Sequence, residues 1–212
     1  MEKIDWTLCL IADTEFASGR DIFRMTEEAV EEGVTLVQLR AKNLSDRDFL
    51  HLALTLSEKL KEKRTPLIIN DRVDIAFSGG AAGVHLGQDD LPLSCARKIL
   101  GRDKLIGISA NTAEEALLAE EGGANYLGVG PVYFTSTKKS AKSPLGLEGF
   151  REIRKKVRIP ILAIGGINRK NASDVMACEA DGIAVISAIW GAKNIHQAVK
   201  ELLTAVKKGK KS

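Results

Sequence analysis

The chain has 212 residues and a mass of 22.9 kDa, which predicts one domain and is near the lower limit for an eight-stranded α/β barrel. Hydrophobic residues make up 44% of it and charged residues 28%, an ordinary balance that excludes disorder over most of its length. The formal charge falls from +3 to −1 when Lys207, Lys208, Lys210 and Lys211 are left out. We therefore expect a near-neutral body over residues 1–206, a basic solvated tail over residues 207–212, and no binding of nucleic acid.

The cysteines and the apolar runs bear on the cellular setting. Cys9, Cys95 and Cys178 are odd in number, far apart and form no C-x-x-C pair, which argues against a disulfide or zinc framework. The N-terminal residues are charged, and no run approaches 18 apolar residues, so neither secretion nor membrane insertion is expected. These features favour a reducing, cytoplasmic location. They leave a homo-oligomer open.

Eight short apolar runs alternate with helical patterns along the chain. We predict strands at residues 8–12, 35–39, 67–69, 82–86, 104–108, 126–129, 161–164 and 182–186. We predict helices at residues 21–32, 45–63, 73–77, 93–100, 112–121, around 150–157, up to 178, and at 195–206. Continuous apolar strands are typical of a parallel sheet covered on both faces. The fold class is therefore α/β, a single (β/α)8 TIM barrel, with an open doubly wound sheet as the alternative.

Polar residues follow most of the predicted strands, at the end where such barrels carry their active sites. Gln38, Arg40 and Lys42 alternate after the second strand, and side chains two apart in an extended chain share one face. The other strand ends carry Asn70 and Asp71, then Gln88, Asp89 and Asp90, then Ser109, Thr135 to Lys139, Gly165-Gly166 and Ser187. These side chains are expected to meet at the mouth of the barrel.

The charges divide this mouth into two anion sites. Asp71 and one of Asp89 and Asp90 supply carboxylates from neighbouring strands, which suits Mg²⁺ shared with substrate phosphates. For Asp71 the alternative is a helix N-cap, and for Asp90 an ordinary surface acid. Arg40, Lys42 and Lys138 would surround the metal, so a diphosphate is the expected ligand.

The second anion site is expected without metal. Gly165-Gly166 and Ile186-Ser187 stand where such barrels bind one phosphate through backbone N–H groups. Two anion sites suggest either two phosphorylated substrates or one substrate with a phosphate at each end. His85 lies inside a predicted strand and is interpreted as a buried, hydrogen-bonded residue.

The segment from Gly130 to Gly146 is long for a connection between a strand and a helix, and such length is commonly functional. Its hydroxyl side chains and paired lysines are typical of an anion-binding loop. We predict that the loop serves both anion sites and becomes ordered when they are filled.

Eight motifs in this order resemble those of the thiamine phosphate synthase family, and the match runs nearly end to end. The motifs are Gln38-Leu-Arg40-Ala-Lys42, Ile69-Asn-Asp-Arg72, Gly83-Val-His-Leu-Gly-Gln-Asp-Asp90, Gly107-Ile-Ser109, Leu127-Gly-Val-Gly-Pro-Val132, Thr135-Ser-Thr-Lys138-Lys139, Ala163-Ile-Gly-Gly-Ile167 and Ser187-Ala-Ile189. Phe134, where proline is usual, and Asn111, where histidine is common, depart from the family pattern.

The resemblance implies that hydroxymethylpyrimidine diphosphate is joined to hydroxyethylthiazole phosphate, plain or carboxylated, giving thiamine phosphate and pyrophosphate. It implies that Lys138, Arg40, Lys42 and Ser109 are catalytic and that Asp71 and Asp90 bind Mg²⁺. The residues implied to bind substrate are Gln38, Leu39, Arg40, Ala41, Lys42, Asn70, Ser109, Thr135, Ser136, Thr137, Lys138, Gly166, Ile186 and Ser187.

Two other functions on the same barrel remain as alternatives. A homologous thiazole tautomerase resembles the chain in its frame but has a histidine where Pro131 stands. A non-catalytic phosphate-binding barrel would be expected to have lost its metal ligands, whereas Asp71 and Asp90 are present.

Overall fold

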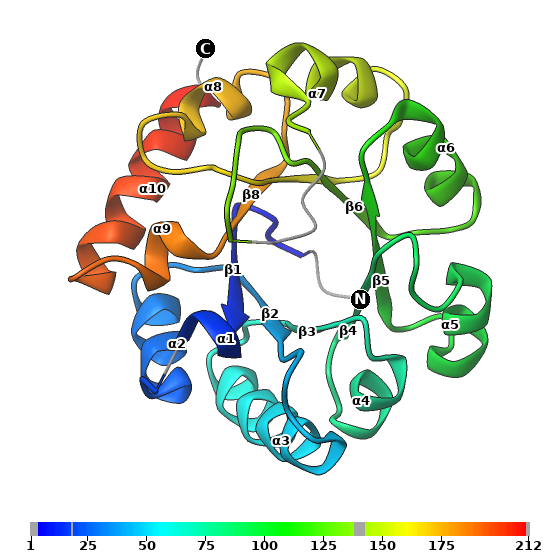
Figure 1. Cartoon of the computed structure of the whole chain (residues 1–212), viewed down its shortest axis with the longest axis vertical. Coiled ribbons are helices and arrows are strands. Elements are labelled where there is room, and N and C mark those ends of the chain that lie inside the picture. The colour runs from blue at the N-terminus through cyan, green and yellow to red at the C-terminus, as the bar shows by residue number, and fades with distance from the viewer. Residues whose placement is uncertain (1–3, 18, 138–142, 211–212) are drawn as a thin grey trace.

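The computed structural model, which describes residues 4–17, 19–137 and 143–210, is a closed barrel of eight parallel strands in sequence order. A ring of helices surrounds the strands (Figure 1). The predicted (β/α)8 class is confirmed, and the open-sheet alternative is wrong because β1 pairs with both β2 and β8. The strands are β1 (Leu8–Asp13), β2 (Leu36–Arg40), β3 (Leu67–Asn70), β4 (Gly83–Leu86), β5 (Leu105–Ala110), β6 (Tyr126–Val129), β7 (Ile161–Ile164) and β8 (Gly182–Val185).

Helices follow the strands in chain order, and the connection from β6 to the helix after it covers residues 130–145. The helices are α1 (Thr14–Ala17), α2 (Ile22–Glu31), α3 (Asp46–Glu62), α4 (Val73–Ser78), α5 (Leu93–Leu100), α6 (Ala113–Glu121), α7 (Gly146–Arg154), α8 (Ala172–Met176), α9 (Ser187–Trp190) and α10 (Ile195–Gly209). Asp21 and Ser45 cap α2 and α3 through their side chains, which is why these helices begin one residue after the predicted starts. None of the described helices is long and apolar enough to cross a membrane.

Several boundaries differ from the predicted ones. Strand β5 runs to Ala110, so Ser109 lies within the ladder opposite Gly128. Helix α8 ends at Met176, and Asn171 occupies its N-cap position without a capping side-chain bond. Helix α10 continues to Gly209. The short helices α1 and α9 were not expected, because a single turn leaves no periodic pattern in the sequence.

Side-chain alternation along the strands produces two apolar layers. One set fills the barrel interior and includes Cys9, Ile11, Leu36 and Tyr126. The other set, which includes Leu39, packs between the strands and the helices. Odd positions of β1 and even positions of β2 face inward, so the same alternation directs Asp13 and Arg40 toward the barrel mouth.

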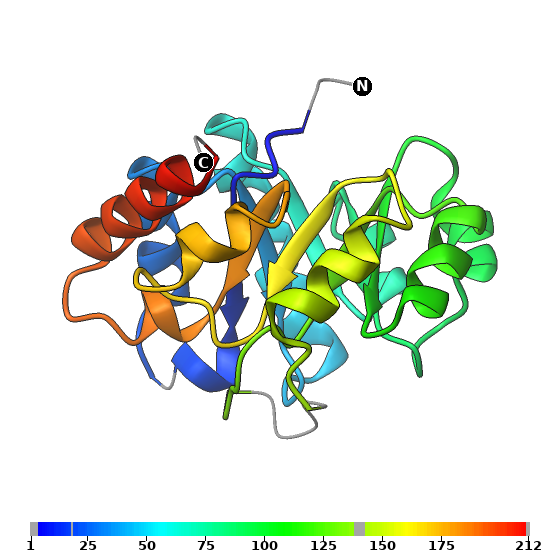
Figure 2. The ribbon, with the colours of Figure 1, turned by 90° about the horizontal axis from the view of Figure 1, so that it is seen from above.

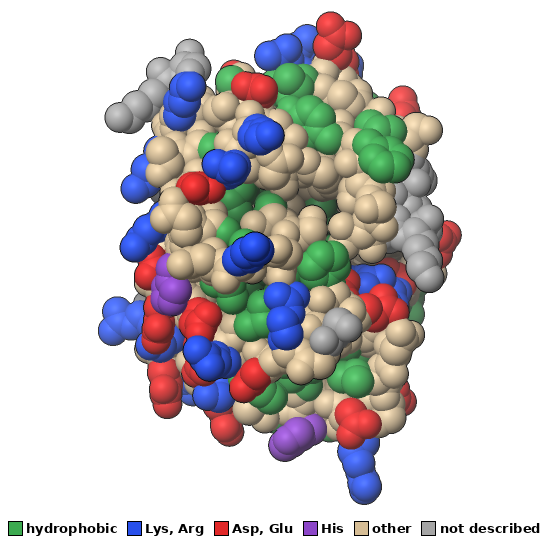
Figure 3. All heavy atoms as spheres, turned by 60° about the vertical axis from the view of Figure 1, so that its left-hand side comes forward, with side chains coloured by type: hydrophobic (Ala, Val, Ile, Leu, Met, Phe, Trp, Pro, Cys, Tyr) green, Lys and Arg blue, Asp and Glu red, His purple; other side chains and the backbone are tan. Residues whose placement is uncertain are grey.

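The two ends of the barrel differ (Figure 2). Helix α1 and the described part of the loop after β6 lie at one end, and the N-terminal segment lies at the other. The side of the molecule on which α10 lies shows basic and acidic side chains interspersed (Figure 3). Glu32, for example, accepts from His196 and lies 3.2 Å from Lys200, and these contacts hold the pKa of Glu32 below its usual value.

Candidate active site

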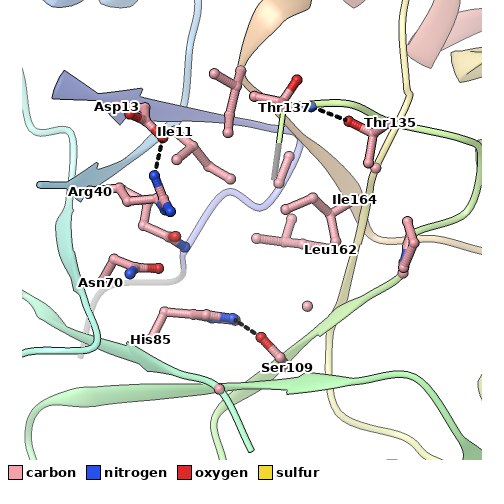
Figure 4. Close-up of a pocket in the computed structure, with 18 of the residues that line it drawn as sticks. Ile11, Asp13, Arg40, Asn70, His85, Ser109, Thr135, Thr137, Leu162 and Ile164 are labelled. Carbon is pink, nitrogen blue, oxygen red and sulfur yellow. Dashed lines mark hydrogen bonds and ion pairs between the residues drawn. The ribbon is translucent and has the colours of Figure 1, made fainter. Parts of the chain in front are cut away.

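A cavity of about 480 Å³ opens at the C-terminal ends of the strands. Its volume is in the range of small-molecule sites. Arg40 and Asn70 lie on one side and Thr135 and Thr137 on another, with His85 and Ser109 below them in the view of Figure 4. The structure brings together twelve of the predicted site residues in the cavity lining: Gln38, Arg40, Lys42, Asn70, Asp71, Asp90, Ser109, Thr135, Thr137, Gly166, Ile186 and Ser187.

Among the described residues, three of the predicted ones are not part of this lining. Leu39 and Ala41 belong to the outer apolar layer, because strand alternation turns them away from Gln38 and Arg40. Their side chains therefore do not reach the cavity. Ser136 is exposed between Thr135 and Thr137, which do line it. Lys138 lies outside the described residues, so its catalytic assignment stays a prediction.

Arg40 is held by carboxylates from the first strand and the turn after it. Its Nη1 donates to Asp13 Oδ2 at 2.5 Å and lies 3.3 Å from Glu15 Oε2. The Asp13 side chain is 3% exposed and that of Arg40 is 16% exposed. Arg40 thus gives the buried Asp13 carboxylate a charged hydrogen-bond partner, and Asp13 in turn fixes the Arg40 guanidinium at the cavity wall.

Asp71 and Asp90 face each other across the ends of β3 and β4. The pKa of the Asp90 carboxyl is raised mainly by burial and secondly by its hydrogen bond with Asp71. Gly87 N donates to Asp90 Oδ2 at 2.6 Å. Lys42 Nζ forms an ion pair with Asp71 Oδ2. The N-cap alternative for Asp71 is wrong, because Arg72 holds that position of α4. Asp90 is half-buried and accepts from Gly87 N, which a plain surface acid would not do.

The carboxylate pair fits a divalent metal that is completed by ligands from a substrate. Among the described residues no group of three His, Cys, Asp or Glu side chains could hold a metal by itself. Two carboxylates with the remaining positions left to phosphate and water suit Mg²⁺. Burial and the neighbouring Asp71 carboxyl raise the pKa of Asp90, and a bound cation would favour the charged form of both carboxyl groups.

A hydrogen-bonded group of side chains forms the floor of the cavity. His85 Nε2 lies 3.0 Å from Ser109 Oγ, and His85 Nδ1 lies 3.1 Å from the hydroxyl of Tyr126. Gln38 also bonds to Tyr126, whose pKa is well above its usual value because the ring is fully buried. A Cβ at Gly107 would lie 2.1 Å from the Tyr126 ring, so glycine is required for the ring to fit. The interpretation of His85 as a buried, hydrogen-bonded residue is confirmed.

The loops after β6 and β7 lie side by side on the opposite wall. Val132 N donates to Ile164 O at 2.9 Å, and Tyr133 N donates to Gly165 O at 3.0 Å. Gly166 has a φ of +66°, and a Cβ there would lie 2.5 Å from Phe134 O. The two loops therefore form one unit that carries Thr135 and Gly166 into the cavity.

The described lining holds more negative than positive side chains. Asp13, Asp71, Asp89 and Asp90 face the cavity, against Arg40 and Lys42. Of the three cations predicted around the metal, Arg40 and Lys42 lie in the lining, and Lys138 lies outside the described residues. A diphosphate could enter such a cavity only together with compensating cations.

Sequence reasoning missed two polar residues of the site, Asp13 and Tyr126. Asp13 follows an apolar strand directly, which is the same signal that identified Asn70, but no site role was assigned to it. Tyr126 looked like an apolar strand residue, because nothing in the sequence shows which strand residues face inward. Gln88 Nε2 donates to Ser109 O at 2.5 Å, and Asn111 donates to Gly130 O.

Comparison with known proteins identifies the family. The model of the thiamine monophosphate synthase family matches residues 8–189. The chain belongs to this family. A thiamine-phosphate synthase of Clostridium novyi is 51% identical over 199 residues, covering 94% of this chain and 98% of its own. A thiamine-phosphate synthase of Chloroflexus aurantiacus is 47% identical over 203 residues, covering 96% and 94%. Membership makes the chain an enzyme, a transferase of thiamine biosynthesis.

Solved structures agree with this assignment. Thiamine phosphate pyrophosphorylase from Pyrococcus furiosus is 38% identical, with a TM-score of 0.89 over 98% of both chains. A 3-hexulose-6-phosphate synthase is 18% identical with a TM-score of 0.70, covering 94% of this chain and 99% of its own, and shows likeness of fold alone.

Proposed function

We propose that the enzyme condenses 4-amino-2-methyl-5-hydroxymethylpyrimidine diphosphate with 4-methyl-5-hydroxyethylthiazole phosphate, or its carboxylated form. The products are thiamine phosphate and pyrophosphate. Family membership supports the product, and the arrangement of the cavity supports the two phosphorylated substrates. The observation that carries the proposal is the separation of Arg40, Lys42 and the Asp71–Asp90 pair from the wall formed by Thr135, Thr137 and Gly166.

The diphosphate belongs to the first of these two groups. Arg40 and Lys42 would donate hydrogen bonds to its oxygens, and Asp71 and Asp90 would hold Mg²⁺. When bound, the Mg²⁺ would neutralise negative charge on the pyrophosphate. Gln38, Asn70 and Ser109 line the adjacent floor and would orient the pyrimidine.

The thiazole phosphate belongs to the opposite wall. The hydroxyls of Thr135, Thr137 and Ser187 and the backbone at Gly166 and Ile186 would bind its phosphate. Lys138 would reach the leaving pyrophosphate from the same loop. This arrangement directs the thiazole ring toward the pyrimidine between the two walls.

The reaction needs little proton transfer. The bond between the pyrimidine methylene carbon and the diphosphate oxygen breaks, and its electron pair leaves with pyrophosphate. The pyrimidinylmethyl cation is then captured by the lone pair of the thiazole nitrogen, which forms the new carbon–nitrogen bond. Arg40, Lys42 and Lys138 would stabilise the charge that grows on the leaving group, so fixed electrostatics supply most of the catalysis.

This function is tested by measuring pyrophosphate release with each substrate alone and with both substrates together. Pyrophosphate release should require both precursors and should stop when EDTA removes Mg²⁺. The thiazole tautomerase alternative predicts turnover of a thiazole compound without pyrophosphate release. Steady release from the pyrimidine diphosphate alone, or full activity in EDTA, would contradict the proposal.

A further inference from the structure

The two carboxylate oxygens of Asp13 have separate partners. Oδ1 accepts from the backbone N–H groups of Glu15, at 2.9 Å, and Phe16, at 3.2 Å, at the start of α1. Oδ2 accepts from Arg40 Nη1 at 2.5 Å. Asp13 and Arg40 are also partners in the parallel ladder of β1 and β2. One buried side chain therefore connects the turn after β1 to a cation of the cavity wall (Figure 4).

Glu15 adds a second, more exposed contact. Its Oε2 lies 3.3 Å from Arg40 Nη1, and its Oε1 accepts from Asn43 Nδ2. The Glu15 side chain is 44% exposed, whereas that of Asp13 is 3% exposed. Water and salt weaken exposed ion pairs, so Asp13 is the stronger of the two restraints.

The contacts leave one edge of the guanidinium for a ligand. In the described part of the chain, the bonds that hold Arg40 use Nη1. The Nε and Nη2 edge is the fork that binds a phosphate group with two parallel hydrogen bonds. A freely rotating arginine loses side-chain entropy when it is fixed, and a prior contact with Asp13 reduces that loss on ligand binding.

We propose that Asp13 is the positioning residue that fixes Arg40 for the diphosphate, which makes the turn after β1 part of the diphosphate site. The inference rests on the proposed function in one respect only, namely that Arg40 faces a diphosphate. Asp13 acts through Arg40 and does not itself touch the substrate.

Two other effects of Asp13 predict different results. As a cap for the first turn of α1, Asp13 would affect stability but not the affinity for a diphosphate. As a negative charge near an anion, it would weaken binding, so its removal would tighten binding. Positioning predicts the opposite, because an unrestrained Arg40 binds a phosphate group less well.

The decisive variant is Asp13→Asn. Its amide keeps one accepting oxygen for the backbone N–H groups of Glu15 and Phe16 but presents donors to Arg40. Asp13→Ser is the second variant, because a hydroxyl still caps a helix and cannot reach the guanidinium as a carboxylate does. Asp5→Asn is the matched control, since Asp5 Oδ1 accepts from Thr7 N at 2.9 Å near the opposite end of β1.

The experiment measures binding of pyrophosphate in the presence of Mg²⁺ by titration calorimetry, together with kcat and KM for both substrates. Asp13→Asn and Asp13→Ser should weaken pyrophosphate binding and lower kcat/KM for the pyrimidine diphosphate by about 10- to 100-fold. The KM for the thiazole phosphate should change by less than about twofold. In an Arg40→Met background, Asp13→Asn should have little further effect, because the residue through which it acts is gone.

Unchanged or tighter pyrophosphate binding in both Asp13 variants would overturn the positioning role. The same loss in the Arg40→Met background would also overturn it. If the unsubstituted protein forms no thiamine phosphate but its pyrophosphate binding still depends on Asp13, the proposed function is overturned and the positioning role is not. Asp5→Asn should leave every one of these values unchanged.

Discussion

Lys42 Nζ forms an ion pair with Asp71 Oδ2. A cationic side chain therefore contacts one of the two carboxylates, Asp71 and Asp90, to which we assign Mg²⁺. Asp71 has a φ of +64°, an uncommon backbone conformation for a residue other than glycine. The ion pair and this backbone conformation both set the position of the Asp71 carboxylate. Lys42 and a metal ion are therefore expected to compete for Asp71 until a diphosphate arrives and gives Lys42 another partner.

Lys42→Met should therefore bind Mg²⁺ more tightly than the parent protein when no diphosphate is present. The expected gain is about fivefold, which corresponds to about 1 kcal/mol for a half-exposed ion pair. Titration calorimetry with MgCl₂ measures it. Lys59→Met is the matched control, because Lys59 pairs with Glu27 on the outer helices. Weaker Mg²⁺ binding in Lys42→Met would contradict the competition.

Gly166→Ala should disturb the wall that we assign to the thiazole phosphate. The new Cβ would lie 2.5 Å from Phe134 O, and the positive φ adds about 1–2 kcal/mol of strain. We expect the KM for the thiazole phosphate to rise at least tenfold. Gly146→Ala is the control, because Gly146 has the same φ of +66° and, apart from its chain neighbours, no atom of the described residues lies within 4 Å of a Cβ there. Equal effects of the two substitutions on KM would show that backbone strain alone explains the result.

Tyr126→Phe should destabilise the barrel. The substitution removes the buried hydroxyl that bonds to Gln38 and lies 3.1 Å from His85 Nδ1, and a hydrogen bond contributes about 0.5–1.5 kcal/mol. The free energy of unfolding, measured with urea, should fall by that amount. Tyr133→Phe, at the half-buried second tyrosine of the chain, should change it by less than about 0.5 kcal/mol. An unchanged free energy of unfolding for Tyr126→Phe would contradict the stabilising role of this hydroxyl.

The three cysteines should differ in reactivity. Burial raises the pKa of the Cys9 thiol to about 12 and also raises that of Cys178, because burial disfavours the charged thiolate. Both thiols should therefore stay protonated and unreactive from pH 7 to pH 9. Cys95 is exposed, so a thiol reagent should label one cysteine in the native protein and three after unfolding. Rapid labelling of two or more cysteines in the native protein would contradict the buried positions.

The barrel was predictable because its strands are mostly apolar and some of its helices begin at capping side chains. Thr112 and Glu115 have the Thr-x-x-Glu spacing of a capping box, and Thr112 Oγ1 accepts from Glu115 N at 3.2 Å. The Glu115 carboxylate, however, accepts from Asn111 N, a neighbour that the pattern does not specify. The ends of some helices depend on tertiary contacts. Helix α10 ends at Gly209, which lies so close to α8 that a Cβ there would be 2.6 Å from the Met176 side chain.

The site was predictable where strand alternation or a run of polar residues marked it. Arg40 and Asp71 follow apolar strands, and both line the cavity. Contacts between strands were not predictable, because pairing Asp13 with Arg40 requires the register of β1 against β2. The carboxylate of Asp13 was therefore not counted among the residues of the site.

Isotope labelling tests most directly whether the enzyme forms thiamine phosphate by breaking the bond between carbon and oxygen of the pyrimidine diphosphate. The pyrimidine diphosphate, labelled with ¹⁸O at the oxygen that joins carbon to phosphorus, is incubated with the enzyme, the thiazole phosphate and Mg²⁺, and the products are analysed by mass spectrometry. The account predicts unlabelled thiamine phosphate and pyrophosphate that carries the label, because the bond between carbon and oxygen breaks. Absence of thiamine phosphate, or label that remains with the pyrimidine, would contradict it.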